Sequence, residues 1–257
     1  MDTSDKGPVS ATRSPYVDPS TGVLRNEVDA TTQEELQEAW ADSLVERLKA
    51  IAESSIPCTG DRAHLQAIHR LLFEGVFDWA GEFRTTNIDK EGTEFVPADR
   101  IDAEIDQLFA DLADENLLRG LPREKFVPRL AHYFARLNHI HPFREGNGRT
   151  QRLFWWHVAL HAGWSIDVVR ATKMAKDEAS RAASQDADLG PLTALLDAVT
   201  SPTTGIEGGT AKLLASVRRR ERWRRFRRWL RSHANPERLI NPASSDRGPG
   251  AGPGGAG

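Results

Sequence analysis

Apolar side chains recur at three- and four-residue spacing through most of this 257-residue chain, and that spacing constrains its fold more than any other feature. Residues that start or stop helices separate the stretches, among them Asp61, Gly75 and Pro122. Thr32 and Glu35 have the spacing of a capping box before the first stretch. The pattern predicts an all-α domain whose helices bury these faces: Leu36, Trp40, Leu44, Leu48 and Ile51; Leu65, Ile68 and Leu72; Ile101, Ile105, Leu108 and Leu112; Phe126, Leu130, Phe134 and Leu137; residues 150–162; and residues 189–199.

Residues 82–97 (EFRTTNIDKEGTEFVP) depart from this pattern. Two short runs with β-branched and aromatic side chains flank Asp89-Lys90-Glu91-Gly92, a four-residue turn with glycine at its last place. We expect one β-hairpin here and no other in the chain. A lone hairpin has free edges, and a free edge can pair with an extended segment of another protein.

The ends of the chain differ from the middle in composition. Only 39% of the residues are hydrophobic, against about 45–50% in a typical globular domain, so we expect one core and poorly ordered ends. Residues 1–14 are small and polar, and residues 235–257 are rich in Pro, Gly and Ser, so both are predicted to be disordered. Between them we expect one domain over residues 15–200, a linker over 201–216 and a basic segment over 217–234.

The basic segment is concentrated in residues 217–231, which hold nine arginines and one glutamate although the whole chain carries a net charge of −3. As a helix, it would place Trp223, Phe226 and Leu230 on one face among the arginines. An acidic protein, nucleic acid or an anionic membrane surface would each fit as a partner, and so would solvent alone.

Some classes of protein are excluded by composition. No apolar run approaches the roughly 20 residues of a membrane-spanning helix, and no charged-then-apolar segment opens the chain. The single cysteine, Cys58, excludes an internal disulfide framework and a zinc site built on cysteines. We therefore expect a cytoplasmic protein and no role for Cys58.

Residues 141–152 (HPFREGNGRTQR) lie between two predicted helices and concentrate side chains suited to phosphate chemistry. Pro142 disfavours helical backbone at the residue before it, so His141 is expected in an extended loop. A histidine there is a competent base at neutral pH, because its usual pKa is about 6.5. Glu145 offers a hard oxygen ligand for Mg²⁺.

The second half of this motif is suited to an anion. Gly146 and Gly148 let backbone amides approach a ligand, and a helix starting near Thr150 would add its positive N-terminal end. Arg149 and Arg152 are three residues apart, so they project from one face of its first turn. A base, a metal ligand, an anion cradle and two arginines in one short segment indicate phosphoryl or nucleotidyl transfer.

Five of the other seven histidines are expected to be ordinary structural residues: His64, His69, His139, His157 and His161. His157 and His161 are four residues apart, which is a metal-ligand spacing on a helix. Their helix is otherwise that of a buried core element, so no metal site is expected there.

The motif HPFREGNGRTQR resembles the Fic-domain signature, H-x-F-x-[D/E]-G-N-G-R-x-x-R, at every specified place. Trp79-Ala80-Gly81-Glu82 before the hairpin is similar to the start of the family's flap, and residues 16–26 (YVDPSTGVLRN) resemble the opening of bacterial Fic toxins and secreted effectors. The resemblance covers residues 16–199. It implies a Fic-type helical domain with the hairpin as flap, acting as a protein adenylyltransferase that transfers AMP from ATP to a protein hydroxyl and releases pyrophosphate.

The resemblance also implies a role for each site residue. His141 would be the general base, Phe143 a structural anchor in the core, and Glu145 the ligand of Mg²⁺. The nucleotide would contact Glu145, Gly146, Asn147, Gly148, Arg149, Thr150, Gln151 and Arg152, with Lys90 and Gly92 from the hairpin turn. The target-docking flap would present Arg84, Thr85, Thr86, Asn87, Ile88 and Phe95 to an extended segment of the target protein.

Two other functions remain open on the sequence. A Fic enzyme could use another nucleotide, phosphocholine or a phosphoryl donor. Alternatively, an inactive core could serve an adaptor that binds nucleic acid or membrane through residues 217–231.

Regulation is a further expectation from the resemblance. Fic proteins are commonly silenced by a helix with the pattern [S/T]-x-x-x-E-[G/N], whose glutamate pairs with the second motif arginine, here Arg152. Residues 203–208 (TTGIEG) match, but they follow Pro202 and contain two glycines, each costing roughly 1 kcal/mol in a helix. Glu207 is therefore a poor inhibitor. We expect a separate, small antitoxin-like protein that supplies the glutamate, and a toxin or an effector translocated into another cell.

Overall fold

The computed structural model describes residues 14–40, 47, 56–90, 93–167, 170, 188–203, 205, 207, 211–213, 215 and 219, without the side chains at 89, 90 and 93. The chain divides into two units, residues 1–216 and residues 217–257, and Arg219 is the one described residue of the second unit. The predicted disorder of residues 1–13 and 235–257, the partners of residues 217–231 and the predicted face at Leu44, Leu48 and Ile51 lie outside the described residues.

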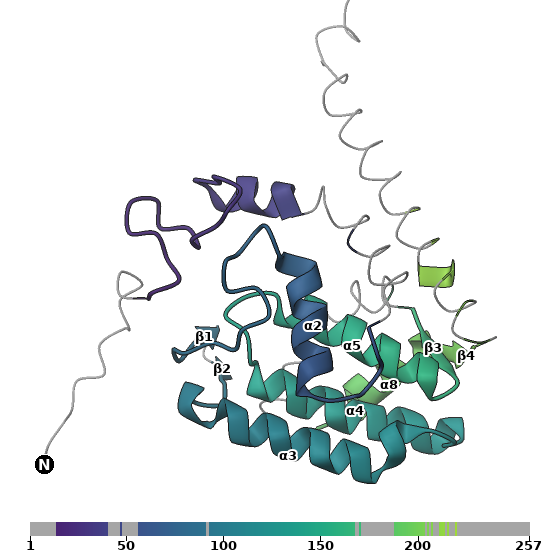
Figure 1. The fold of residues 1–257 in the computed structure, drawn as a ribbon. Helices are drawn as coiled ribbons and strands as arrows, with labels where there is room; N and C mark the ends of the chain where they lie inside the picture. The colour runs from purple at the N-terminus through teal and green to yellow at the C-terminus, as the bar shows by residue number, and fades with distance from the viewer. Residues whose placement is uncertain are drawn as a thin grey trace, which may run out of the picture. The chain divides into compact units, whose positions relative to one another are not determined.

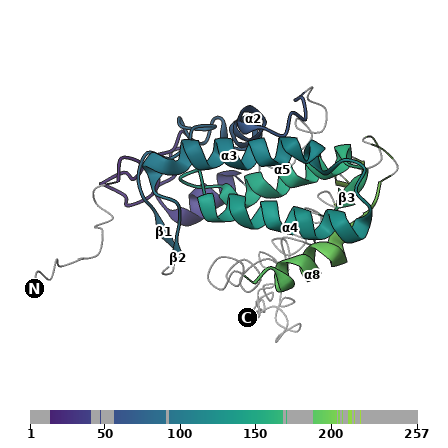
Figure 2. The ribbon, with the colours of Figure 1, turned by 90° about the horizontal axis from the view of Figure 1, so that it is seen from below.

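Helices make up most of the described part of the chain. In chain order they are residues 33–40, α2 (Arg62–Phe73), η2 (Ala98–Arg100), α3 (Ile101–Asp114), η3 (Asn116–Leu118), α4 (Arg123–Ile140), α5 (Asn147–His161) and α8 (Gly190–Val199). Figures 1 and 2 show α3, α4 and α5 side by side, with α2 packed on α5 and α8 packed on α4. The predicted fold class, all-α with a hairpin, is confirmed.

Two of the predicted helix starts form side-chain caps. The hydroxyl of Thr32 accepts a hydrogen bond of 3.2 Å from the N–H of Glu35, whose carboxylate accepts one of 3.1 Å from the N–H of Thr32. The carboxylate of Asp61 accepts a hydrogen bond of 2.9 Å from the N–H of His64 at the start of α2. These bonds satisfy amides that have no partner inside the helix, which is why both helices begin where the sequence predicted.

The core is formed by the facing sides of α2, α3, α4 and α5. Ile68 of α2 and Ile105 of α3, both on predicted faces, are fully buried. Burial of a large apolar side chain contributes roughly 1.5–3 kcal/mol to stability, and several of the largest buried side chains are aromatic. The largest fully buried aromatic side chains are Trp155, Tyr133, Phe73, Phe126, Phe143 and Phe154.

The predicted hairpin is present but shorter. It consists of β1 (Asp89–Lys90) and β2 (Thr93–Glu94), paired antiparallel with Asp89 opposite Glu94 and Lys90 opposite Thr93. Asp89 therefore lies in a strand, and the turn is one residue later than the predicted Asp89–Gly92.

The run before β1 does not pair because its polar groups are engaged elsewhere. The N–H of Thr85 donates a hydrogen bond of 3.0 Å to the hydroxyl of Tyr16, and the side-chain oxygen of Asn87 accepts one of 2.8 Å from the N–H of Ala98. Tyr16 also packs edge-on against Trp79, with ring centroids 5.5 Å apart. The N-terminal segment thus supports the base of the hairpin.

A second antiparallel pair was not predicted. β3 (Trp164–Ile166) pairs with β4 (Thr200–Pro202), with Ile166 opposite Thr200. The predicted linker over residues 201–216 is wrong at two positions. Residues 201 and 202 belong to β4, which pairs with β3, and Leu213 is buried. Strands of three residues are too short to show periodicity, and Pro202 favoured a loop although proline is tolerated in an edge strand.

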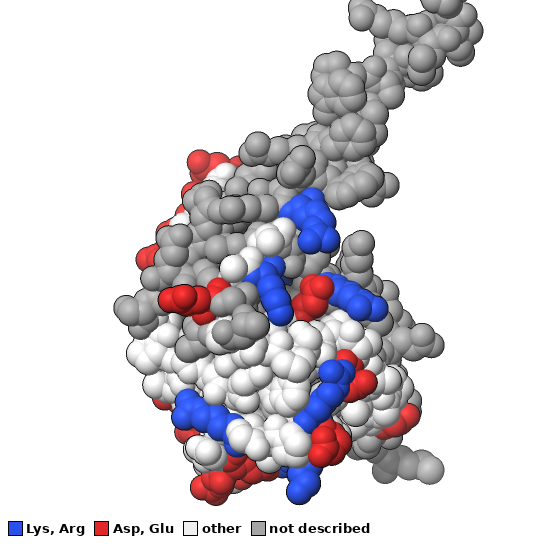
Figure 3. All heavy atoms as spheres, turned by 90° about the vertical axis from the view of Figure 1, so that its right-hand side faces the viewer, with Lys and Arg blue, Asp and Glu red and all other residues white. Residues whose placement is uncertain are grey.

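Two surface properties bear on function. Among the described residues, no helix has the length and apolar character needed to cross a membrane. On the face drawn in Figure 3, Lys and Arg side chains lie interspersed with Asp and Glu, so this face of the described residues shows no concentration of one sign of charge.

Candidate active site

The predicted motif forms the connection between α4 and α5. α4 ends at Ile140, and His141 caps it with left-handed backbone angles, φ 49° and ψ 59°. The N–H of His141 donates a hydrogen bond of 3.1 Å to the carbonyl of Leu137. The prediction of an extended His141 is therefore wrong, because a left-handed cap satisfies a carbonyl at the helix end that Pro142, which has no N–H, cannot serve.

The ring of His141 is held in one orientation. Its Nδ1 donates a hydrogen bond of 3.1 Å to the carbonyl oxygen of Asn138, so in the neutral ring the lone pair lies on Nε2. The ring of Phe95 stacks on it, with centroids 4.0 Å apart and an interplanar angle of 22°. The side chain of Asn138 accepts a hydrogen bond of 3.1 Å from Gln151. The backbone of α4 and the hairpin together present Nε2 as the nitrogen that can take a proton.

A tight turn at Gly146 starts α5. Gly146 has φ 82°, and a Cβ on it would lie 2.3 Å from Cε2 of Phe73, so no other residue fits. The N–H groups of Arg149 and Thr150 both donate to the carbonyl of Gly146, at 3.0 Å.

The helix therefore begins at Asn147, three residues before the predicted start near Thr150. Within the described residues, no backbone acceptor meets the N–H of Asn147 or Gly148, the first two amides of α5. Open amides of this kind, together with the positive end of the helix dipole, are what binds phosphate at helix N-termini.

The side chain of Asn147 braces the loop. Its Oδ1 accepts a hydrogen bond of 2.9 Å from the N–H of Phe143, and its Nδ2 donates one of 2.6 Å to the carbonyl of the same residue. With both polar atoms engaged and the residue buried, the predicted nucleotide contact is wrong for the side chain of Asn147 and remains a prediction for its N–H. Phe143 is buried and stacks on His69, with ring centroids 3.8 Å apart.

His69 connects three parts of the site. Its Nδ1 accepts a hydrogen bond of 2.8 Å from the N–H of Gly81 at the start of the hairpin segment. Its Nε2 therefore carries the proton and donates a hydrogen bond of 3.1 Å to the carbonyl of Glu145. Burial lowers the pKa of His69 to about 3, so the ring is neutral near pH 7. The sequence predicted only an ordinary helix residue, because no spacing links His69 to the motif.

The two charged side chains at the start of α5 pair with each other. Nη2 of Arg149 lies 2.6 Å from Oε1 of Glu145. The guanidinium also lies over the ring of Trp40, 4.2 Å from its centroid, and over Phe73, 4.8 Å from its centroid. Burial lowers the pKa of Arg149 and Glu145 raises it. The sequence predicts Trp40 only as a core residue of its helix.

Glu145 also fits the predicted Mg²⁺. Its side chain is 41% exposed, which leaves the carboxylate accessible beside its contact with Arg149. Mg²⁺ in proteins keeps several waters and is held by one or two carboxylates plus substrate phosphates, so one carboxylate is sufficient.

The remaining motif residues divide between surface and core. A Cβ on Gly148 would lie 3.1 Å from Nη1 of Arg152, which places that guanidinium beside the first turn of α5. Thr150 and Gln151 are buried, and Gln151 bonds to Asn138. Their predicted nucleotide contacts are wrong for the side chains, because these two helix positions point to the core.

Arg84, predicted to dock a target, is instead an internal clamp. Its side chain is buried and donates hydrogen bonds of 2.9 Å to the carbonyl of His141 and 3.3 Å to that of Ile140, and it also bonds to the carbonyl of Val96. Its N–H donates a hydrogen bond of 2.8 Å to Pro142. The prediction for Arg84 is wrong, because a buried guanidinium engaged by these carbonyls cannot meet a partner.

The other hairpin residues are distributed as follows. Thr85 and Asn87 are exposed, Thr86 and Ile88 are half-buried, and Phe95 is half-buried against His141. The side chain of Lys90 and the whole of Gly92 lie outside the described residues.

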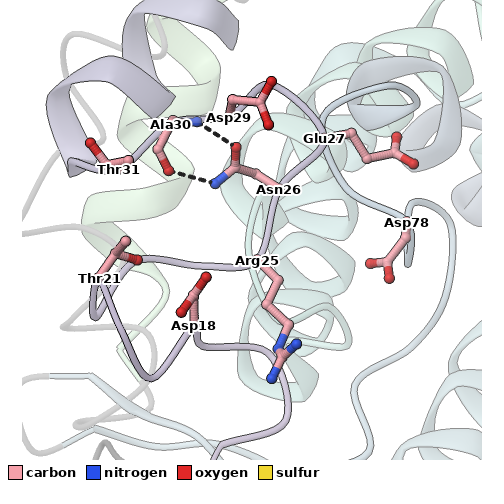
Figure 4. Close-up of a pocket in the computed structure, with 9 residues that line it drawn as sticks. All are labelled: Asp18, Thr21, Arg25, Asn26, Glu27, Asp29, Ala30, Thr31 and Asp78. Carbon is pink, nitrogen blue, oxygen red and sulfur yellow. Dashed lines mark hydrogen bonds between the residues drawn. The ribbon is translucent and has the colours of Figure 1, made fainter.

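A hollow of about 580 Å³ lies elsewhere, formed by the loop after Tyr16. In Figure 4 the amide of Asn26 bonds to both backbone groups of Ala30, at 2.9 and 3.0 Å, and carboxylates surround the space. The hollow shares no residue with the motif and is not part of the candidate active site. Its lining residues are Asp18, Thr21, Arg25, Asn26, Glu27, Asp29, Ala30, Thr31 and Asp78.

Known proteins resemble this chain over the part that contains the motif. The Fic/DOC family model matches residues 59–159. A probable protein adenylyltransferase Fic of Escherichia coli K12 is 37% identical over 183 residues, 71% of this chain and 88% of that protein. Protein adenylyltransferase VbhT of Bartonella schoenbuchensis is 37% identical over 166 residues, 65% of this chain and 35% of that protein.

Solved structures show the same fold. The VirB-translocated effector BepC of Bartonella tribocorum, with bound AMPPNP, superposes with a TM-score of 0.65 at 28% identity, covering 74% of this chain and 97% of that one. The type IV secretion system effector BepA superposes with a TM-score of 0.68 at 32% identity, covering 73% of this chain and 68% of that one. The chain therefore belongs to the Fic/DOC family and is an enzyme of its protein adenylyltransferase class.

Proposed function

We propose that the chain transfers AMP from ATP, taken up with Mg²⁺, to a hydroxyl side chain of a target protein and releases pyrophosphate. The observation that carries this proposal is the hydrogen bond from Nδ1 of His141 to Asn138, which puts the basic lone pair of the neutral ring on Nε2, in the same short loop that leads to the open amides of α5. The names of the relatives and the AMPPNP bound to BepC support the choice of donor.

The reaction is a substitution at the α-phosphorus. The target oxygen forms a bond to that phosphorus, the bond to the bridging oxygen of the β-phosphate breaks, and pyrophosphate leaves. The hydroxyl proton passes to Nε2 of His141, and such a base typically contributes roughly 10²–10⁴-fold. The N–H groups of Asn147 and Gly148 and the guanidinium of Arg152 stabilise phosphate charge. Glu145 would hold Mg²⁺, which neutralises phosphate charge when bound.

Position-specific labelling of ATP tests the proposal. The full chain is incubated with Mg²⁺, bacterial lysate and ATP labelled at either the α- or the γ-phosphate. We expect protein labelling from α-labelled ATP alone, lost in His141→Ala and retained in His139→Ala, an exposed histidine two residues away. Labelling from the γ-phosphate would show a phosphoryl donor reaction. Labelling from CDP-choline carrying a labelled choline would show a phosphocholine donor, and undiminished transfer by His141→Ala would contradict the assigned base.

We also propose that an extended segment of the target pairs with the hairpin. Among the described residues β1 and β2 form a sheet of two strands, so each has an outer edge, and Phe95 connects that hairpin to the His141 ring. Glu94→Pro, which removes one backbone N–H, should reduce target labelling more than Glu94→Ala while ATP binding is unchanged. Equal labelling by the two variants would exclude backbone pairing at this position.

A separate inhibitory protein that directs a glutamate at Arg152 completes the proposal. Glu207, the internal alternative, is exposed. The segment before it is held at the other end of α5, where the N–H of Thr203 donates to the carbonyl of Gly163, about 14 Å along the helix axis from Arg152. Expression of the wild-type chain alone should arrest growth, and Glu207→Gly should change nothing. A harmless wild type with a toxic Glu207→Gly variant would place the inhibitor inside the chain.

A further inference from the structure

We propose that Cys58, His157 and His161 form a binding site for a zinc-class divalent metal ion, separate from the active site. One potential ligand atom from each residue lies within 4.8 Å of the other two, and all three residues are half-buried. A thiolate and two imidazoles are the ligands that Zn²⁺ and Co²⁺ prefer. This runs against both expectations from the sequence, which gave Cys58 no role and the histidine pair no metal.

The three side chains come from two elements that meet in the fold. His157 and His161 lie one turn apart near the end of α5, with ring centroids 5.1 Å apart. Cys58 lies in the loop that precedes the cap of α2, and α2 packs on α5. Zn²⁺ sits about 2.3 Å from sulfur and about 2.0–2.1 Å from nitrogen, which places tetrahedral ligand atoms roughly 3.5 Å apart. A closure of about 1 Å by side-chain rotation would therefore complete the site.

His64 is a positioning residue for this cluster. Its Nε2 lies 2.9 Å from Nδ1 of His157. The N–H of Gly60 donates a hydrogen bond of 3.3 Å to Nδ1 of His64, so in the metal-free protein Nε2 of His64 carries the proton and donates to Nδ1 of His157. A metal on Nε2 of His157 reverses this bond, because His157 must then donate from Nδ1, and His64 gives up its bond to Gly60. Metal-binding histidines regularly donate from their second nitrogen in this way, which fixes the ring. His64 is itself buried on α2, with its ring 4.8 Å from that of Phe154.

The protonation states suit metal uptake. Burial lowers the pKa of His157 to about 4 and also lowers that of His161, so both rings are neutral near pH 7 and can act as ligands. Burial raises the pKa of the Cys58 thiol to about 11, so the metal must displace its proton, and each bound ion releases one proton.

The cluster is remote from the chemistry of His141. His157 lies ten residues after Asn147, the first residue of α5, which corresponds to about 15 Å along the axis. A metal here would join the loop before α2 to the end of α5. It would act on the stability of these two helices and would not touch a substrate at the motif.

Cobalt spectroscopy on the full chain tests the proposal. The protein is stripped with a chelator and titrated with Co²⁺, whose tetrahedral thiolate complexes give both a visible d–d band and a near-ultraviolet sulfur charge-transfer band. We expect one ion per chain, both bands, and displacement by Zn²⁺ with a rise in melting temperature. Cys58→Ser and His161→Ala should lose all of these, and His64→Ala should weaken binding about 10–100-fold while keeping the sulfur band.

His132→Ala is the matched control, since His132 is a half-buried histidine of α4 outside the cluster. It should bind as the wild type does. A wild-type protein without the sulfur band at saturating Co²⁺ would overturn the proposal even if the cluster variants failed to fold. Unchanged stoichiometry in Cys58→Ser and His161→Ala would do the same, because the ion would then be held elsewhere.

Discussion

Nε of Arg84 donates a hydrogen bond of 2.9 Å to the carbonyl oxygen of His141. The same guanidinium bonds to the carbonyls of Ile140 and Val96, so one buried cation fastens the hairpin to the residue proposed as base. Burial lowers the pKa of Arg84, but an arginine remains charged at neutral pH.

Arg84→Met should therefore impair both stability and transfer. Each buried carbonyl left without a donor costs roughly 1–3 kcal/mol, and the backbone of His141 and of Val96 loses the side chain that joins them. We expect a clear drop in the urea midpoint and an approximately tenfold or greater loss of initial rate at a temperature where the variant is folded. Arg100→Met, which removes an exposed arginine paired with Glu104, should change little. Normal transfer by folded Arg84→Met would show that the clamp does not affect catalysis.

Gly146→Ala should destabilise the protein more than Gly75→Ala. Both glycines have positive φ, 82° and 70°, so both substitutions carry a backbone cost of roughly 1–2 kcal/mol. A Cβ at Gly75 meets nothing within 4 Å, whereas one at Gly146 collides with Phe73. Urea unfolding of the two variants measures the difference in stability. Adding Phe73→Leu to Gly146→Ala removes the ring that the new methyl meets, so the double variant should recover part of the lost stability. Equal losses would mean that the loop relaxes around the added methyl.

His69 should make the domain sensitive to acid. The unfolded chain takes up a proton on this histidine below about pH 6.5, whereas the folded chain does so only near pH 3. The unfolded state therefore binds more protons between these pH values. The contribution of neutral His69 to the free energy of unfolding is complete above pH 6.5 and is lost as the pH falls, by roughly 1 kcal/mol per pH unit. His69→Gln should reduce the slope of unfolding free energy between pH 6.5 and pH 4.5. Parallel slopes would show that His69 is protonated in the folded state.

Glu145→Gln should raise the Mg²⁺ concentration needed for half-maximal transfer. An amide is a weaker ligand than a carboxylate for this hard cation. The variant also removes the charge that faces Arg149, so ATP affinity without Mg²⁺ should not fall. Transfer rates over a Mg²⁺ titration, with ATP binding measured separately in EDTA, distinguish the two effects. An unchanged Mg²⁺ dependence would contradict metal ligation by Glu145.

Deletion of residues 217–257 should leave self-modification intact. The chain divides at residue 216, and the motif and hairpin lie entirely in the first unit. Labelling of the truncated chain with α-labelled ATP, alongside its melting curve, provides the measurement. A truncated chain that is insoluble would show that the second unit supports the first.

The helices could be predicted because each combines a long periodic face with a start signal. Ile101 and Ile105 on α3, or Asp61 before α2, are examples in which local chemistry decides the structure. β3 and β4 could not be predicted, because three residues carry no periodicity and their pairing joins segments more than 30 residues apart. For His141 the local rule gave the wrong result. A residue before proline is expected to be extended, but His141 adopts left-handed backbone angles and caps α4.

The sequence was sufficient to locate the site, but not to predict which of its residues face a ligand and which bond inside the protein. HPFREGNGRTQR identified the segment, yet its spacing did not show that Asn147 and Gln151 bond inside the protein. The supporting residues His69, Arg84 and Asn138 lie outside the signature, and only the folded chain brings them to it. In the sequence these three residues stand in ordinary helix or loop positions, and no motif or spacing indicates that they support the site.

The pairing of Arg149 with Glu145 has a consequence for which ligands the site accepts. The guanidinium is balanced by a carboxylate and covered by two aromatic faces, so it offers little open charge to a passing polyanion. A ligand that brings only negative charge must displace Glu145 and leave it uncompensated. A nucleotide that arrives with its metal would give each of them a new partner at once, the phosphate for the arginine and the cation for the carboxylate. The ion pair thus favours ligands that carry both charges together over ligands that carry negative charge alone.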